Sequence, residues 1–98
     1  MAETVTVIAY HRARPGQEVA LRQALLALCA PTRAENGCLN YDLHESLDEP
    51  ALLVFHENWT SKALLDAHLK SPHITAFIRR MDELLAEPPR LTLWRRCE

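Results

Sequence analysis

The densest group of polar and aromatic side chains is the five-residue run from Phe55 to Trp59. Side chains alternate along a strand, so Phe55, Glu57 and Trp59 are expected on one face. If that face meets a helix carrying His68, Phe55 and Trp59 would wall a pocket for an aromatic molecule, and Glu57 or His68 would handle a proton. The structural alternative is a Trp59 in the core and a Glu57 that pairs with a histidine or caps a helix.

Tyr41 and His73 each allow two interpretations. A tyrosine in the middle of a strand either packs through its ring with one hydrogen bond or donates from a pocket wall. His73 is expected in the first turn of a helix, where the helix dipole disfavours a positive charge, so the sequence predicts a neutral imidazole. A neutral imidazole can act as a general base, and it can equally face solvent.

The five histidines invite a metal-binding interpretation. No two of them stand four residues apart on one expected helix, and His68 and His73 lie on either side of a helix break at Ser71-Pro72. We therefore expect no protein-bound metal. The sequence also has no phosphate-binding glycine loop, no nucleophile elbow and no His-Glu-x-x-His motif.

The elements that must position these residues are four strands and two helical regions. The strands are expected over 4–12, 38–44, 51–59 and 90–96, where β-branched and aromatic residues are frequent. In the second strand the alternation places Leu39, Tyr41 and Leu43 on one side and Cys38 and Asn40 on the other. Asn36-Gly37, just before this strand, ends a helix.

Both helical regions are interrupted by proline. The first carries an apolar stripe over 21–28 and is expected to kink or break at Pro31. In the second, a short helix capped by Ser61 carries His68. A longer helix then begins at Ser71-Pro72 and continues, with one apolar stripe, until Pro88-Pro89.

This order of elements, β-α-β-β-α-β, predicts an α+β, ferredoxin-like fold with a four-stranded antiparallel sheet. Helices can cover one face of such a sheet, yet the first strand carries apolar side chains on both faces, with Val7 and Ala9 opposite Ile8 and Tyr10. The sequence therefore predicts that the open face is buried against a second copy in a two-fold homodimer.

Composition limits the chain to one small globular domain. It has 98 residues, of which 48% are hydrophobic and 24% charged, and a formal net charge of −2. This charge disfavours nucleic-acid binding, which requires a basic face. We expect no association with membranes, because no apolar run approaches the roughly 18 residues of a membrane span. Three scattered cysteines, at positions 29, 38 and 97, favour reduced thiols and a cytoplasmic location.

The run from Glu35 to Leu43 (Glu-Asn-Gly-Cys-Leu-Asn-Tyr-Asp-Leu) resembles the second-strand signature of the antibiotic biosynthesis monooxygenase (ABM) family. Other matches follow in order: Glu57-x-Trp59, Ala63-Leu64 with His68, Ser71-Pro72-His73 and Phe77, together with the opening Val7-Ile8-Ala9 and Pro15-Gly16. The resemblance covers nearly all of the single domain 1–98 and is nearest to the small quinol monooxygenases. It implies a dimeric α/β barrel, formed sheet to sheet, with a substrate cavity between sheet and helices in each protomer.

The resemblance also implies oxidation of a quinol or similar small aromatic by O2 without a cofactor. Deprotonating a hydroquinone gives an electron-rich anion that can pass an electron to oxygen, so the protein must bind the ring, take the proton and stabilise the oxyanion. Phe55 replaces a strand-three asparagine of the polyketide-quinone-forming members, so their mechanism does not transfer as it stands. The residues expected to act are Trp59, Phe55 and Phe77 as walls, His68, His73 or Glu57 as the base, Tyr41 or Asn40 as donors, and Arg79 as the match for a cavity arginine.

Three other functions occur among proteins of this type. Haem degradation is disfavoured, because the first strand has no asparagine and His68 occupies the expected tryptophan position. An isomerase of a small phosphorylated signal molecule is an alternative, since those enzymes share the Pro-His at the start of the last helix; Arg79 and Arg80 would have to bind the phosphate. A non-catalytic ligand-binding or stress-response dimer is a third possibility, because one fold hosts many functions.

Overall fold

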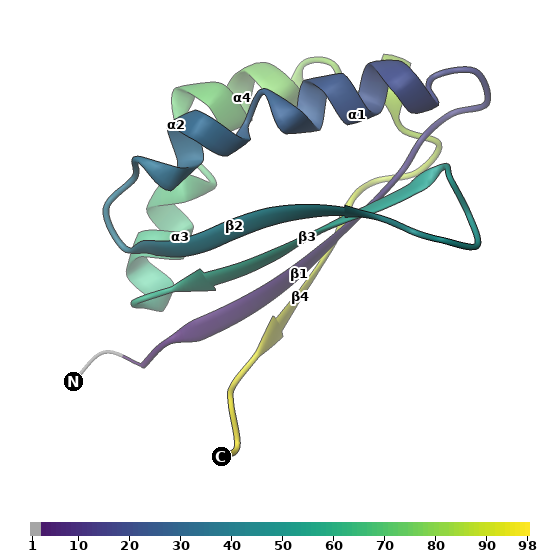
Figure 1. Cartoon of the computed structure of the whole chain (residues 1–98). Helices are drawn as coiled ribbons and strands as arrows, with labels where there is room; N and C mark the ends of the chain where they lie inside the picture. Colours follow the sequence, from purple (N-terminus) through teal and green to yellow (C-terminus); the bar gives the residue numbers. More distant parts are fainter. Residues whose placement is uncertain (1–2) are drawn as a thin grey trace.

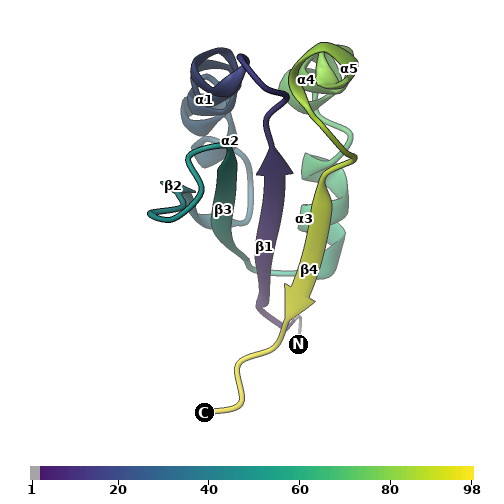
Figure 2. The same ribbon diagram turned by 90° about the vertical axis from the view of Figure 1, so that its right-hand side faces the viewer.

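Four strands form one antiparallel sheet in the computed structural model, which describes residues 3–98 (Figure 1). Their order across the sheet is β2-β3-β1-β4, as Figure 2 shows from the side, so β1 and β3 are the central strands. This is the ferredoxin-like arrangement, and the predicted fold class is confirmed. The strands are β1 (Val5–Arg12), β2 (Cys38–Glu45), β3 (Leu52–Trp59) and β4 (Arg90–Trp94).

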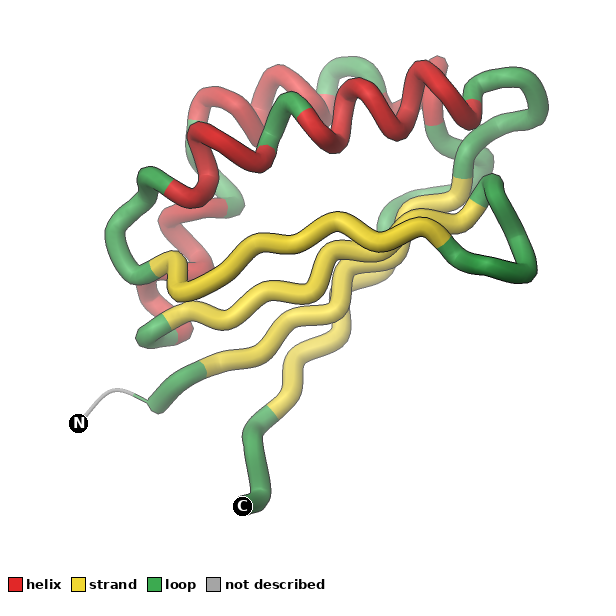
Figure 3. Tube along the Cα trace, in the orientation of Figure 1, coloured by secondary structure: helices red, strands yellow, loops and turns green. Residues whose placement is uncertain are grey.

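The helices lie together on one face of the sheet and leave the other face open (Figure 3). Ser61 and Ser71 cap two of them, each accepting a hydrogen bond from a backbone N–H three residues later. Among residues 3–98, no helix has the length and apolar composition that crossing a membrane requires. The helices are α1 (Glu18–Leu26), α2 (Cys29–Arg33), α3 (Lys62–His68), α4 (Pro72–Ile78) and α5 (Met81–Leu84).

The first helical region is interrupted, as predicted, but before Pro31 and not at it. The break falls at Ala27 and Leu28, which places Pro31 at the third position of α2. A proline is tolerated in the first turn of a helix, because its missing N–H would have no partner there.

The expectation of one long helix from Ser71-Pro72 onward is wrong, because it is divided into α4 and α5 at Arg79 and Arg80. At the division the Arg80 N–H bonds to the Phe77 carbonyl, three residues earlier, at 2.9 Å. The early end of α5 follows from tertiary contacts with the end of β1. The Arg14 N–H donates to the Leu84 carbonyl at 2.9 Å, and Ala13 forms a β-bridge with Leu85. The backbone at Leu85 is therefore extended, and the helix cannot continue.

The second strand departs from simple alternation at its start. A β-bulge between Cys38 and Asn40 turns Leu39 outward, where 59% of it is exposed. The expected grouping of Leu39 with Tyr41 is therefore wrong, whereas Tyr41 itself faces the helices and is buried. The last strand also ends two residues earlier than expected, at Trp94.

The core lies between the sheet and the helices. Val7, Leu53 and Trp59 from the two central strands pack in one cluster with Leu21 and Leu25 of α1. All five are at most 1% exposed. Burying the two leucines of α1 alone contributes about 3–6 kcal/mol, which fixes that helix to the sheet.

The open face is more polar than the sequence suggested. Its centre carries the half-buried apolar residues Ile8, Tyr10 and Val54, but polar side chains surround them. Asn40 and Asn58, for example, bond to each other across β2 and β3. The expected homodimer remains a prediction.

Candidate active site

A cavity of about 230 Å³ opens between the sheet and the helices α3 and α4. Most of its wall is apolar, and the titratable side chains that line it are few. Its volume is slightly below the usual range for ligand sites, which favours a small ring compound over a large cofactor. The residues that line it include Ala9, His11, Tyr41, Phe55, Glu57, His68 and Phe77.

Strand β3 supplies one side of this cavity through its alternation. Phe55, Glu57 and Trp59 all point toward the helices and are buried, as the sequence predicts. Ala9 on β1 lies opposite Phe55. Because alanine has a short side chain, this register leaves space above the middle of the sheet.

Glu57 is a buried carboxyl group with one fixed hydrogen bond. It is 3% exposed, and the Trp59 indole Nε1–H donates to its Oε1 at 2.9 Å. Burial raises the pKa of Glu57 from 4.5 to about 7, although the Trp59 hydrogen bond acts in the opposite direction. A carboxyl group in this condition can give or take a proton near neutral pH.

Trp59 is completely buried and is not among the residues lining the cavity. Its ring lies 4.7 Å, centroid to centroid, from the ring of His68. This corrects the expectation that Trp59 walls the pocket. Trp59 instead supports two residues that do line it, His68 by packing and Glu57 by the hydrogen bond.

His68, His73 and Glu35 form a hydrogen-bonded cluster beside the cavity. The Oε2 atom of Glu35 lies 2.6 Å from His68 Nδ1 and 2.8 Å from His73 Nε2. An ionised carboxylate only accepts, so both imidazole nitrogens donate to it. With its proton on Nδ1, His68 has a free lone pair on Nε2, the nitrogen available to the cavity that it lines.

Burial lowers the pKa of His68, while the neighbouring Glu35 acts to raise it. His68 is 2% exposed, whereas His73 is 20% exposed. His73 is not among the cavity-lining residues and instead hydrogen-bonds the same Oε2 atom of Glu35 as His68 does. Of the three bases suggested by the sequence, His68 and Glu57 therefore line the cavity. His73 lies outside the cavity wall and contacts it only through Glu35.

Glu35 had no assigned role in the sequence interpretation, and it is the residue that connects the two histidines. It lies in the turn between α2 and β2, 33 residues before His68 in the chain. Nothing in the local sequence indicates that this turn reaches α3 and α4.

The side chains of Glu35, His68 and His73 also offer ligand atoms within 4.8 Å of one another, a set that could chelate a metal ion. The two hydrogen bonds already occupy those same atoms.

Tyr41 and Phe77 complete the aromatic part of the wall. The Tyr41 ring stacks on Phe55 with centroids 4.1 Å apart, and it meets His68 edge-on at 5.4 Å. Burial raises the pKa of the Tyr41 hydroxyl, so this group is a neutral donor. Phe77 of α4 lines the cavity, as the sequence suggested.

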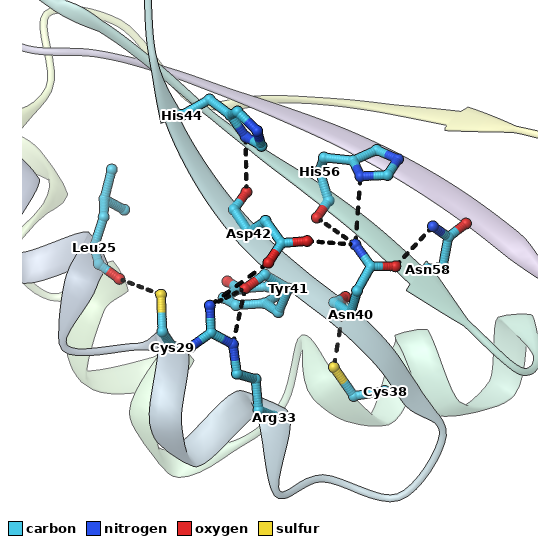
Figure 4. A network of polar contacts seen from close by, with 10 residues as sticks. All are labelled: Leu25, Cys29, Arg33, Cys38, Asn40, Tyr41, Asp42, His44, His56 and Asn58. Carbon is cyan, nitrogen blue, oxygen red and sulfur yellow. Dashed lines mark hydrogen bonds and ion pairs between the residues drawn. The ribbon is translucent and has the colours of Figure 1, made fainter.

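Asn40 and Arg79 do not line the cavity, which corrects two expectations. Asn40 points to the open face of the sheet, where it lies between His56 and Asn58 (Figure 4). Because Tyr41 points inward, its neighbour Asn40 must point outward. Arg79 is exposed at the end of α4, since the helix turns away there.

His11 also lines the cavity. In the sequence it counted only as one of the five histidines and had no assigned role. It is 7% exposed, and its ring meets those of Phe55 and Phe77 edge-on, each at 5.9 Å. Its Nδ1 atom is buried and has no hydrogen bond of good geometry within residues 3–98, although the backbone of Ala9 and Leu53 acts to raise the pKa of the ring. Burial lowers the pKa of His11 from 6.5 to about 4, so the ring is neutral at physiological pH. Alternation along β1 could have placed it among the inward residues, but not at a cavity.

Comparison with known proteins agrees with this fold over the whole chain. The family model described as antibiotic biosynthesis monooxygenase matches residues 4–80. "Putative monooxygenase Rv0793" of Mycobacterium tuberculosis is 43% identical over 93 residues, covering 95% of this chain and 91% of that protein. "Probable quinol monooxygenase YgiN" of Escherichia coli K12 is 40% identical over 85 residues, covering 74% of this chain and 80% of that protein.

Solved structures give the same result. The crystal structure of PA3566 from Pseudomonas aeruginosa matches with a TM-score of 0.94 and 37% identity, covering 100% of this chain and 98% of that one. The structure of Rv0793 matches with a TM-score of 0.91 and 41% identity, covering 98% and 97%. The match of the family model over residues 4–80, together with these relatives, shows that the chain belongs to the antibiotic biosynthesis monooxygenase family.

Proposed function

We propose that this family member oxidises a small phenol or quinol with O2 in the cavity between the sheet and helices α3 and α4. The observation that carries the proposal is His68, whose Nδ1 is held by Glu35 at 2.6 Å while its ring lines an aromatic cavity. A neutral imidazole oriented by a carboxylate is a general base, and an apolar cavity with aromatic walls binds a ring.

The reaction needs no electrons beyond those of its substrate. His68 Nε2 takes the proton of the phenolic hydroxyl, and the resulting phenolate passes one electron to O2, which gives a phenoxyl radical and superoxide. The two recombine to form a C–O bond at a ring carbon that carries hydrogen. The peroxide receives the proton held by His68 and loses water, which leaves a quinone carbonyl at that carbon. One phenol and one O2 thereby give one quinone and one H2O.

The other residues of the site support these proton transfers. Glu35 stabilises the imidazolium that forms on His68, as a buried carboxylate does for a catalytic histidine, and His73 holds the same carboxylate oxygen from the other side. Glu57, whose pKa is raised to about 7, lines the same cavity and can give or take a proton there near neutral pH as water is lost. Tyr41 is a neutral donor for the developing oxyanion.

Two observations favour a quinol-like substrate over a phosphorylated one. The relative from Escherichia coli that is 40% identical carries the name of a quinol monooxygenase. Among the described residues, no arginine or lysine lines the cavity, and Arg79 lies outside it. A phosphate would need such a partner, so the isomerase alternative receives no support from this site.

We also propose that the working unit is a homodimer formed through the open face of the sheet. Ile8, Tyr10 and Val54 give this face an apolar centre within a polar rim, the usual anatomy of an interface. Trp94 of β4, a residue that is 56% exposed, adds an aromatic side chain.

Oxidation in the presence of ¹⁸O2 tests the proposed reaction. A panel of one- and two-ring phenols and quinols is incubated with the protein, and oxygen uptake and product mass are followed. We expect uptake faster than autoxidation for at least one member, with one ¹⁸O atom in the product and one in water. Products formed without oxygen would contradict the proposal in favour of an isomerase. Ligands that raise the melting temperature without any turnover would favour a binding protein.

A further inference from the structure

His11 is a buried polar side chain in the cavity wall that the proposed proton transfers leave unused. It comes from β1, on the same face as Ala9, and it lines the same cavity as His68 and Glu57. Its surroundings are apolar, since the edges of its ring face Phe55 and Phe77. Packing alone would be satisfied here by a leucine of similar volume.

The unpaired nitrogen of His11 is the second observation. Nδ1 is buried and has no hydrogen bond of good geometry among the described residues, and the nearby backbone of Ala9 and Leu53 only partly offsets the effect of burial on the imidazole. A buried nitrogen without a partner is unfavourable, and most such groups in folded proteins are paired. A ligand that enters the cavity, with a small shift of the ring that exposes the buried Nδ1, would give this imidazole a better partner than the backbone of Ala9 and Leu53 does.

The register of the sheet places His11 and Glu57 at different ends of the cavity. Glu57 lies opposite Val7 on β1, and His11 follows Val7 by four residues. Four residues of strand correspond to about 13 Å between Cα atoms. Ala9 and Phe55, which oppose each other, lie between the two ends. A flat ring resting over this pair therefore has one end toward Glu57 and the other toward His11.

We propose that His11 hydrogen-bonds a second oxygen of the substrate, so that the cavity selects para-dihydroxy aromatics of one or two rings over aromatics with a single hydroxyl. This rests on the proposed function, because it assumes that the first hydroxyl lies toward His68 and Glu57. A neutral imidazole has one donor and one acceptor nitrogen, so it can bind the hydroxyl of a quinol and also the carbonyl of a quinone.

Ligand binding without oxygen tests this assignment separately from turnover. The probes are 1,4-dihydroxynaphthalene and 4-methyl-1-naphthol, which have similar shapes and differ in one hydroxyl group. Their dissociation constants are measured anaerobically by calorimetry for the wild type and for His11→Leu, His11→Gln and His11→Asn. His44→Leu, at an exposed histidine outside the cavity wall, is the matched control.

We expect the wild type and His44→Leu to bind the diol about tenfold more tightly than the methyl compound, the usual effect of one hydrogen bond. His11→Leu loses this preference while binding the methyl compound as well as the wild type does. Recovery in Gln or Asn identifies the ring nitrogen, since the Gln amide reaches the place of Nε2 and the Asn amide that of Nδ1.

Equal binding of the two probes by the wild type, no binding of either, or an unchanged preference in His11→Leu would overturn the role of His11. If the preference is present but no quinol is oxidised, the proposed oxidation fails and the binding site stands. If quinols are oxidised but the wild type shows no binding preference, the proposed oxidation stands and the role of His11 fails.

Discussion

Two titratable residues of the cavity, His11 and Glu57, have pKa values that burial shifts in opposite directions. The pKa of His11 is lowered from 6.5 to about 4, so the unfolded chain binds a proton below pH 6.5 that the folded protein refuses, and stability falls as the pH falls from 6.5 to 4. The pKa of Glu57 is raised from 4.5 to about 7, so the folded protein keeps a proton that the unfolded chain loses. From this group, stability falls as the pH rises from 4.5 to 7. The two contributions oppose each other where their ranges overlap.

Single substitutions should expose each contribution. Relative to the wild type, His11→Leu should gain free energy of unfolding as the pH falls from 6.5 toward 4, by about 3 kcal/mol over the full range. Glu57→Gln should gain a similar amount relative to the wild type as the pH rises from 4.5 to 7. Urea denaturation at several pH values measures both differences. Variant and wild-type curves that stay parallel across this range would contradict the two shifts.

The sequence was informative about residues whose orientation depends on local alternation, and uninformative about those that meet through the fold. Phe55 and Glu57 face the helices because side chains alternate along β3. The pairing of Glu35 with His68 depends on how close a turn comes to a helix 33 residues later, and no spacing rule gives that distance. The exclusion of Arg79 from the cavity likewise depends on where α4 ends.

Among the connecting elements, the turn after α2 has the strictest requirement. Gly37 has φ of 87°, and a Cβ added there would lie 2.9 Å from both Leu64 Cβ and Thr60 Oγ1. Gly16 has a similar φ of 86° but open space around it. The two glycines therefore share the backbone requirement and differ in packing.

Gly37→Ala should lower the free energy of unfolding by about 2–4 kcal/mol, because a left-handed backbone and overpacking add. Gly16→Ala, the matched control, should lose only about 1 kcal/mol, from the backbone alone. Chemical denaturation measures both. Since Gly37 directs the turn that holds Glu35, the first variant should also slow any reaction that uses His68. Equal losses in the two variants would show that the contact with Leu64 and Thr60 is unimportant.

The helices and strands, like the single residues, were predictable where local sequence determines them and unpredictable where tertiary contacts do. Strands and helices with a strong apolar period were predicted with small errors at their ends, since that period is a local property. The end of α5 at Leu84 could not be predicted, because it is imposed by the backbone pairing of Ala13 and Arg14 with Leu85 and Leu84. The bulge that exposes Leu39 is also set by pairing with β3.

For the whole molecule, the open sheet face determines the expected assembly. If Ile8, Tyr10 and Val54 form the centre of a dimer interface, a charge placed there must be desolvated on association. Val54→Lys should therefore convert a dimer into monomers and halve the mass measured by light scattering at micromolar concentration. Leu47→Lys, at a fully exposed turn position, should leave the mass unchanged. A monomeric wild type, or a Val54→Lys protein that remains dimeric, would contradict this interface.

Oxygen consumption with a quinol measures whether His68 takes the proton of an aromatic hydroxyl. Wild type, His68→Gln and Arg79→Gln are compared at pH 7 on the substrate oxidised fastest by the wild type. General bases contribute about 10²–10⁴-fold, so His68→Gln should be at least about 100-fold slower than the wild type. Arg79→Gln should match the wild type, because Arg79 lies outside the cavity. A His68→Gln protein that consumes oxygen at the wild-type rate would show that His68 is not the base.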